Sequence, residues 1–279
     1  MVRFRLLIFT LVAILLFSIP VDAYALPSPQ QAASSSAGDE LNEGVSAYKA
    51  ARYDEAIGHF RRATELAPDN AMAKVYLATA LAQNVVPALD TPDNLKVAQQ
   101  AIEMFQQVLA GQPHDINSLK QVAAVYFSVK KLDEARDWQM KVLNEDPTDP
   151  EAAYTIGVID WTKAHQNALK ILIAAGLNDD GEGNSNVPAN LLSRIRNENA
   201  DLVEEGLRYL QQAIANRPNY DDAMAYVNLV YRRKADLDFD NPKARGEDVA
   251  MAKEWMNKAM AARKANEEEG VRHLVSAPQ

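Results

Sequence analysis

Ile116–Pro147, INSLKQVAAVYFSVKKLDEARDWQMKVLNEDP, is the stretch that decides the fold of this chain. Apolar residues recur at helical spacing before and after its central Val-Lys-Lys, with Leu119 and Val122 on one side and Ala135 and Val142 on the other. The Val-Lys-Lys break predicts a tight turn, and the proline closes the unit. The stretch therefore predicts two short amphipathic helices packed against each other as a hairpin.

The same pattern recurs along the chain. A small residue stands in each predicted second helix where the two helices would cross, and a proline usually follows twelve positions later. The small residues are Ala56, Ala101, Ala135, Gly206 and Ala252, and the later residues are Pro68, Pro113, Pro147, Pro218 and, in the fifth copy, Lys264. The first helices carry Gly44, Ala78, Ala123, Gly157 and Asn228 at the matching place. Small residues allow two helix axes to approach closely, so the pattern predicts five stacked hairpins.

A helical hairpin with a 34-residue period, the spacing from Pro113 to Pro147, resembles the tetratricopeptide repeat (TPR) family. The resemblance covers roughly residues 37–264, and it implies an all-α, right-handed superhelix (solenoid) of about five hairpins over residues 39–269. Leu119 stands where the family has a large aromatic residue, and Asn228 replaces a small one, so the fifth crossing is expected to be looser. The segment 221–237 also resembles exported repeat proteins of environmental bacteria, which implies no particular activity.

Three hairpins carry insertions, near residues 84–94, 162–200 and 234–246. The first contains Pro87 and Pro92 and predicts a loop. The second predicts a lengthened hairpin, with a helix from Glu151 to about Ala175, a polar glycine-rich loop and a long helix after Pro188. The end of this hairpin is expected to project from the stack. The sequence leaves open whether it packs on a neighbouring hairpin or forms an arm that binds a partner.

The N-terminus has the layout of a secretory signal peptide. Arg3 and Arg5 precede an apolar run of 14 residues, and Ala23-Tyr24-Ala25 offers a cleavage site, so residues 1–25 are predicted to be removed. The alternative is an uncleaved anchor, but 14 residues span about 21 Å, less than the roughly 30 Å of a bilayer core. We expect an exported protein, periplasmic or extracellular, with a flexible linker at 26–38 and a disordered tail at 270–279.

Composition excludes several classes of function. The formal charge of −9 opposes binding to phosphate backbones, so no nucleic-acid partner is expected. The chain has no cysteine, which rules out disulfides, thiolate metal sites and cysteine nucleophiles. Its four histidines are scattered without a metal-binding spacing, and Gly181-Glu182-Gly183 has no predicted strand before it. We therefore expect no catalytic activity, no cofactor and no small-molecule substrate.

One acidic segment, residues 236–247, nearly matches a calcium-binding loop. Asp236, Asp238 and Asp240 alternate, and Glu247 follows at the distance of the last ligand. Asn241 replaces the glycine of the sharp turn, and no second loop is evident to pair with this one. The alternative is a solvated acidic linker. A calcium-modulated scaffold is thus one alternative function, and a membrane-tethered assembly factor that keeps residues 1–25 is another.

The family resemblance implies that the first helices line a concave groove, where a peptide or a helix of another protein binds. The residues four positions after the small one are Tyr48, Ala82, Phe127, Trp161 and Arg232, and Asn117, Lys120 and Tyr154 should project nearby. Aromatic residues and arginine dominate binding hot spots. The alternative is that the aromatic rings fill the space between adjacent hairpins. We predict a non-catalytic protein-binding scaffold in the cell envelope, whose protein partner the sequence does not identify.

Overall fold

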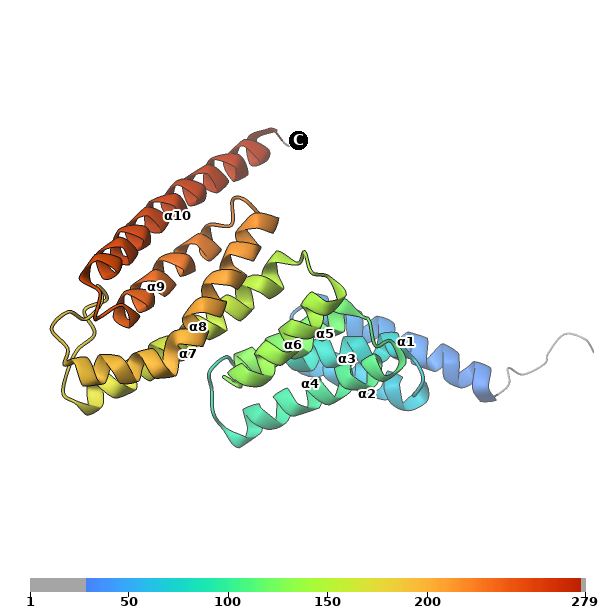
Figure 1. The fold of residues 1–279 in the computed structure, drawn as a ribbon. Coiled ribbons are helices and arrows are strands. Elements are labelled where there is room, and N and C mark those ends of the chain that lie inside the picture. The colour runs from blue at the N-terminus through green and yellow to red at the C-terminus, as the bar shows by residue number, and fades with distance from the viewer. Residues whose placement is uncertain (1–28, 277–279) are drawn as a thin grey trace, which may run out of the picture.

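Ten α-helices and no β-strand make up the part of the chain that the computed structural model describes, residues 29–276, with side chains described for 36–269 (Figure 1). The helices are α1 (Pro29–Lys49), α2 (Tyr53–Leu66), α3 (Ala71–Gln83), α4 (Pro92–Gly111), α5 (Ile116–Ser128), α6 (Leu132–Glu145), α7 (Pro150–Ala174), α8 (Ala189–Asn216), α9 (Asp221–Leu237) and α10 (Pro242–Ser276). They pair in chain order into five hairpins that stack one after another. The predicted all-α solenoid is confirmed.

The small residues lie at the helix crossings, as the repeat pattern predicted. A Cβ atom added to Gly44 would lie 2.4 Å from the ring of Phe60, and one added to Gly157 would lie 2.5 Å from Leu210 Cγ. The exception is Asn228, which is fully buried and donates a hydrogen bond to the carbonyl oxygen of Ala252 at 2.5 Å. This bond ties α9 to α10, so the expected loosening of the fifth crossing is replaced by a polar contact.

The turns follow from local chemistry. In the central hairpin, α5 ends at Ser128 and α6 begins at Leu132, so the predicted Val-Lys-Lys turn is confirmed. Lys130 has a φ of 60°, which lets the chain reverse within three residues. Asp115 caps α5 and Asp149 caps α7, because each side chain accepts backbone N–H groups of the helix that follows.

The insertions differ in kind. Residues 84–91 form a loop, as predicted, and Asn94 of α4 fixes it through hydrogen bonds with the backbone of Val86 and Leu89. The fourth hairpin is lengthened as predicted, with a loop at residues 175–188 that we call the tip loop. The third insertion, expected near 234–246, is mostly helical: only residues 238–241 interrupt α9 and α10. Its Arg, Lys and Ala residues favour a helix, and α9 packs along the lengthened fourth hairpin.

The structure differs from the prediction at both ends. Helix α1 begins at Pro29, so residues 29–38 of the expected flexible linker are helical. Pro29 occupies the first turn, where proline is tolerated, and Gln, Ala and Ser after it do not stop a helix. Helix α10 continues to Ser276, inside the expected disordered tail, after a stretch whose Ala, Lys, Arg and Glu residues favour a helix. The predicted signal peptide, residues 1–25, lies outside the described residues. Between residues 29 and 276, no helix is long and apolar enough to cross a membrane.

A buried ion pair joins the third hairpin to the fourth. Arg136 of α6 donates to Asp160 of α7, with Nε and Oδ1 2.8 Å apart, and also contacts Glu205 of α8. Asp160 is closed off from solvent, and burial raises the pKa of its carboxyl, which Arg136 opposes. Helix α7 packs on α6 whereas its contacts with α5 are sparse, so this ion pair lies at the main connection between the two halves of the stack seen in Figure 1.

Candidate binding surface

An aromatic cluster joins the first helices of the fourth and fifth hairpins. Its members are Tyr154, Trp161 and His165 of α7, Tyr226 of α9, and Tyr220, which immediately precedes α9. Tyr226 lies between the two predicted residues, with ring centroids 5.7 Å from Tyr154 and 5.3 Å from Trp161. His165 stacks on Trp161 at 5.1 Å. Edge-to-face and stacked pairs at these distances stabilise the contact between the two helices.

Every ring in the aromatic cluster is half-buried. Burial raises the pKa of Tyr154 and Tyr226 above the ordinary value of 10, so both hydroxyls stay neutral at physiological pH. Burial also lowers the pKa of His165, with help from the nearby Arg233 guanidinium, which favours the uncharged imidazole. The cluster therefore fills the space between two hairpins and still presents uncharged aromatic edges to solvent.

Helix α5 presents the most accessible of the predicted residues. Phe127 is 37% exposed, and Asn117 is also exposed on the same helix. Lys120 is different, because it forms an ion pair with Asp149 and lies 3.8 Å from Glu151. Its charge is therefore already balanced by the start of α7. On α1, Tyr48 is half-buried and its ring lies 5.3 Å from that of Tyr53.

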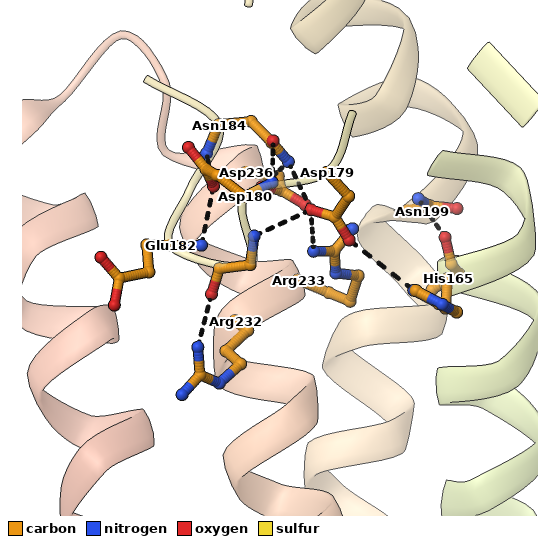
Figure 2. Close-up of polar contacts among 11 residues, drawn as sticks. His165, Asp179, Asp180, Glu182, Asn184, Asn199, Arg232, Arg233 and Asp236 are labelled. Carbon is orange, nitrogen blue, oxygen red and sulfur yellow. Dashed lines mark hydrogen bonds and ion pairs between the residues drawn. The ribbon is translucent and has the colours of Figure 1, made fainter. Parts of the chain in front are cut away.

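Arg232 is used inside the fold. Its Nη1 donates a hydrogen bond to the carbonyl oxygen of Gly181 at 2.8 Å, so it holds the tip loop (Figure 2). Arg233, the next residue, donates to Asp179 at 2.7 Å. The structure thus does not group Arg232 with the aromatic residues of the predicted groove.

The tip loop packs on α9 through a buried polar network (Figure 2). Asn184 is buried and donates through Nδ2 to Asp236 Oδ1 at 2.8 Å, and Arg233 lies between Asp179 and Asp236. The Arg233 guanidinium and several hydrogen bonds lower the pKa of Asp179, although burial opposes them. The sequence left open whether the lengthened hairpin packs on a neighbouring hairpin or forms an arm that binds a partner. In the structure it packs on its neighbour.

The four carboxylates of the calcium-like segment do not converge. Asp236 belongs to α9 and points at Arg233, Asp238 pairs with Lys234 at 3.3 Å, and Asp240 pairs with Arg196. Glu247 is on α10 and lies 3.8 Å from Lys243. Within the described residues, no three His, Asp or Glu side chains are placed to hold a metal ion. The geometry is not that of a calcium loop, because Asp236 lies on α9, Asp238 and Asp240 lie in the turn at residues 238–241, and Glu247 lies on α10.

Comparison with known proteins agrees with this architecture. A family model described as tetratricopeptide repeat matches residues 41–85, which span the last nine residues of α1 and all of α2 and α3. A crystal structure of MamA protein superposes with a TM-score of 0.56 at 12% identity, over 84% of this chain and 95% of its own. Residues 41–85 therefore match the tetratricopeptide-repeat family, and the described chain shares the fold of this repeat structure.

Two further structures are similar to this chain to different degrees. MamA residues 41 to the end, from Desulfovibrio magneticus RS-1, superposes with a TM-score of 0.55 at 16% identity, over 82% of this chain and 96% of its own. YrrB, described as a TPR protein with an unusual peptide-binding site, reaches only 0.49 at 13% identity, over 85% and 99%. No curated protein matches the sequence. Identities this low show the shared fold alone.

Three members of the aromatic cluster, His165, Tyr220 and Tyr226, were not predicted from the sequence. The repeat pattern points to the position four residues after the small one, whereas Tyr226 stands two residues before Asn228 and Tyr220 precedes α9. His165 was set aside as a lone histidine. The available signal was its spacing: it follows Trp161 by four residues, which places both rings on one face of α7.

Proposed function

We propose that this TPR protein is a non-catalytic scaffold of the cell envelope that holds a peptide or a helix of another protein on its inner face. The observation that supports the proposal is the arrangement of aromatic side chains on the first helices. The aromatic cluster presents half-buried rings along α7 and α9, and Phe127 is exposed on α5. Partly exposed aromatic rings held in fixed positions are typical anchors of protein interfaces, since little side-chain entropy is lost when they bind.

Phe127 offers the sharpest test, because it is exposed and is not part of the aromatic cluster. A photo-reactive phenylalanine analogue at position 127 is expected to crosslink the partner in cells. The same analogue at Ile173, which is 68% exposed near the end of α7, serves as the matched control. Mass spectrometry of the crosslinked product would identify the bound segment of the partner.

Binding to that segment then separates the groove from other surfaces. With a synthetic peptide of the crosslinked sequence, Phe127→Ala should raise the Kd at least about tenfold, whereas Ile173→Ala should leave it unchanged. Trp161→Ala is a weaker test, because Trp161 also packs on Tyr226 and its loss would disturb the fold. Equal affinity of the Phe127→Ala variant and the unchanged protein would reject the groove as the binding site.

The proposed envelope location rests on the layout of residues 1–25. Mass spectrometry of the intact protein tests it. The intact protein recovered from the envelope fraction should lack residues 1–25 and begin at Leu26. A mass that retains these residues would instead favour the alternative, a membrane-tethered assembly factor. Recovery only from the cytoplasm would reject both locations.

A further inference from the structure

The last helix, α10, exposes a position that every other second helix of the stack buries. Four positions after the small residue, the earlier copies place Phe60, Phe105, Gln139 and Leu210, and all four are buried. The fifth copy places Met256 there, and it is 38% exposed. Eight positions after the small residue, Leu109 and Leu143 are buried and Thr64 and Ile214 are half-buried, whereas Met260 is 56% exposed.

Elsewhere in the stack, the next hairpin adds to the cover that the first helix of the same hairpin provides. Phe60 of α2 stacks on Tyr76 of α3, with ring centroids 5.4 Å apart. Arg136, one position after the small residue of α6, pairs with Asp160 of α7. Lys253 stands at the same position of α10, and its side chain is 63% exposed. The open face of α10, formed by Lys253, Met256 and Met260, therefore lacks the antiparallel helix that covers it in each earlier copy.

The other end of the solenoid does not fit this face. In α3, Ala73 stands five positions before the small residue Ala78, and Leu77 stands one position before it. Both residues are buried. The matching residues of α1 are Asp39 and Glu43, and both are exposed. Covering Met260 with α1 of another copy would bury these carboxylates against apolar atoms at a large desolvation cost. The polar face of α1 is thus typical of a terminal cap and opposes head-to-tail stacking.

The α10 helix of a second copy of the chain does fit against the open face of α10. If two α10 helices lie antiparallel around a two-fold axis at Met260, Lys253 of each copy faces Glu267 of the other, and Met256 faces the aliphatic stem of Lys264. Glu267 is exposed, and the acid nearest to Lys253 within its own chain is Glu182, 4.0 Å away. The charges are therefore complementary in the antiparallel arrangement, which also reproduces the direction of a covering first helix.

The length of α10 is suited to such a contact. Helices α2 and α6 have 14 residues each, whereas α10 has 35 and continues twelve residues past Lys264. At 1.5 Å per residue, α10 spans about 52 Å, enough for a long antiparallel overlap on both sides of Met260. We propose that the open face of α10 pairs with α10 of a second copy and forms a two-fold symmetric dimer.

Sedimentation equilibrium of the purified protein tests the proposal. The protein should be a dimer whose dissociation is visible on dilution, and Met260→Glu should weaken dimerisation at least about tenfold. Ile173→Glu, an equally drastic change at a residue that is 68% exposed, should leave it unchanged. A protein that is monomeric at every concentration, or a dimer that Met260→Glu does not weaken, would overturn the proposal. Oligomers that increase in size with protein concentration would also overturn the proposal.

Charge reversal tests the register. Lys253→Glu and Glu267→Lys should each weaken the dimer, because each places like charges opposite one another, and the two changes in one chain should restore it. A double variant as weak as the single ones would overturn the antiparallel register. Since the chain has no cysteine, Met260→Cys adds a direct readout. It should form a disulfide-linked dimer under mild oxidation, whereas Ile173→Cys should not.

Discussion

Arg233 and Asp236 face each other one turn apart on α9, with Arg233 Nη1 3.0 Å from Asp236 Oδ2 and both side chains closed off from solvent. The guanidinium also holds Asp179 of the tip loop. A cation supplied by the chain itself thus occupies the position between these two carboxylates. The pair joins the lengthened fourth hairpin to the fifth.

The Asp236 carboxyl is the first target for a pH test. Burial raises its pKa from the ordinary 3.8 to about 7, opposed by Arg233 and Asn184 and reinforced by the charges of Asp179 and Asp180. The folded protein therefore keeps a proton that the unfolded chain releases, so the contribution of Asp236 to stability falls as pH rises from about 4 to about 7. Asp236→Asn should match the unchanged protein near pH 4 and unfold at higher urea concentration at pH 8.

The gain in the Asp236→Asn variant should grow by at most about 1.4 kcal/mol for each pH unit within that window. Asp240→Asn is the matched control. Asp240 is exposed, and its hydrogen bond to Arg196 lowers its pKa, so its contribution has the opposite sign and is lost at low pH. A similar gain in both variants at pH 8 would contradict the assignment.

The connection between the two halves of the stack depends on Arg136. Replacing it with methionine leaves the buried Asp160 without its cation, and breaking a buried pair in this way costs about 3–5 kcal/mol. We expect the urea midpoint of Arg136→Met to fall accordingly. Adding Asp160→Asn to the same chain removes the unpaired charge and should recover part of the loss. No recovery would mean that the cost comes from lost packing of the arginine stem.

The close crossing of α7 and α8 is tested by Gly157→Ala. The new Cβ would lie 2.5 Å from Leu210 Cγ and 3.1 Å from the backbone oxygen of Gly206, so overpacking should cost about 1–3 kcal/mol of unfolding free energy. Gly246→Ala on α10 is the matched control, because no atom lies within 4 Å of its added Cβ. It should stabilise the protein by up to about 1 kcal/mol through helix propensity. Thermal unfolding of both variants distinguishes crowding from propensity.

The loop at residues 84–91 should be released by a change in α4. Asn94 is buried, donates to the carbonyl oxygens of Val86 and Leu89, and accepts from the Val86 N–H. Asn94→Ala removes all three bonds and should speed amide hydrogen exchange in residues 85–91 by at least about tenfold. Asn94→Asp keeps only the acceptor and should give an intermediate rate if it stays ionised. Unchanged exchange in both variants would show that other contacts hold the loop.

Much of the candidate binding surface followed from helical spacing. Trp161 and Tyr154 were placed on the inner face of α7 because they stand at fixed distances from Gly157, and such distances determine which face of a helix a residue occupies. Spacing did not show that Tyr226 of α9 packs against Trp161, nor that Lys120 is paired with Asp149. Those contacts depend on how neighbouring hairpins are rotated against each other.

The sequence by itself determined the five hairpins, their order and the lengthened fourth pair. A helix period and a small residue at each crossing are local features, readable within about 34 residues. Only the tertiary structure decided that Arg233 meets Asp179, 54 positions away, and that the face of α10 stays open. The physical reason is that charge pairing and burial depend on distances between helices far apart in the chain, and those distances are set when the whole stack packs.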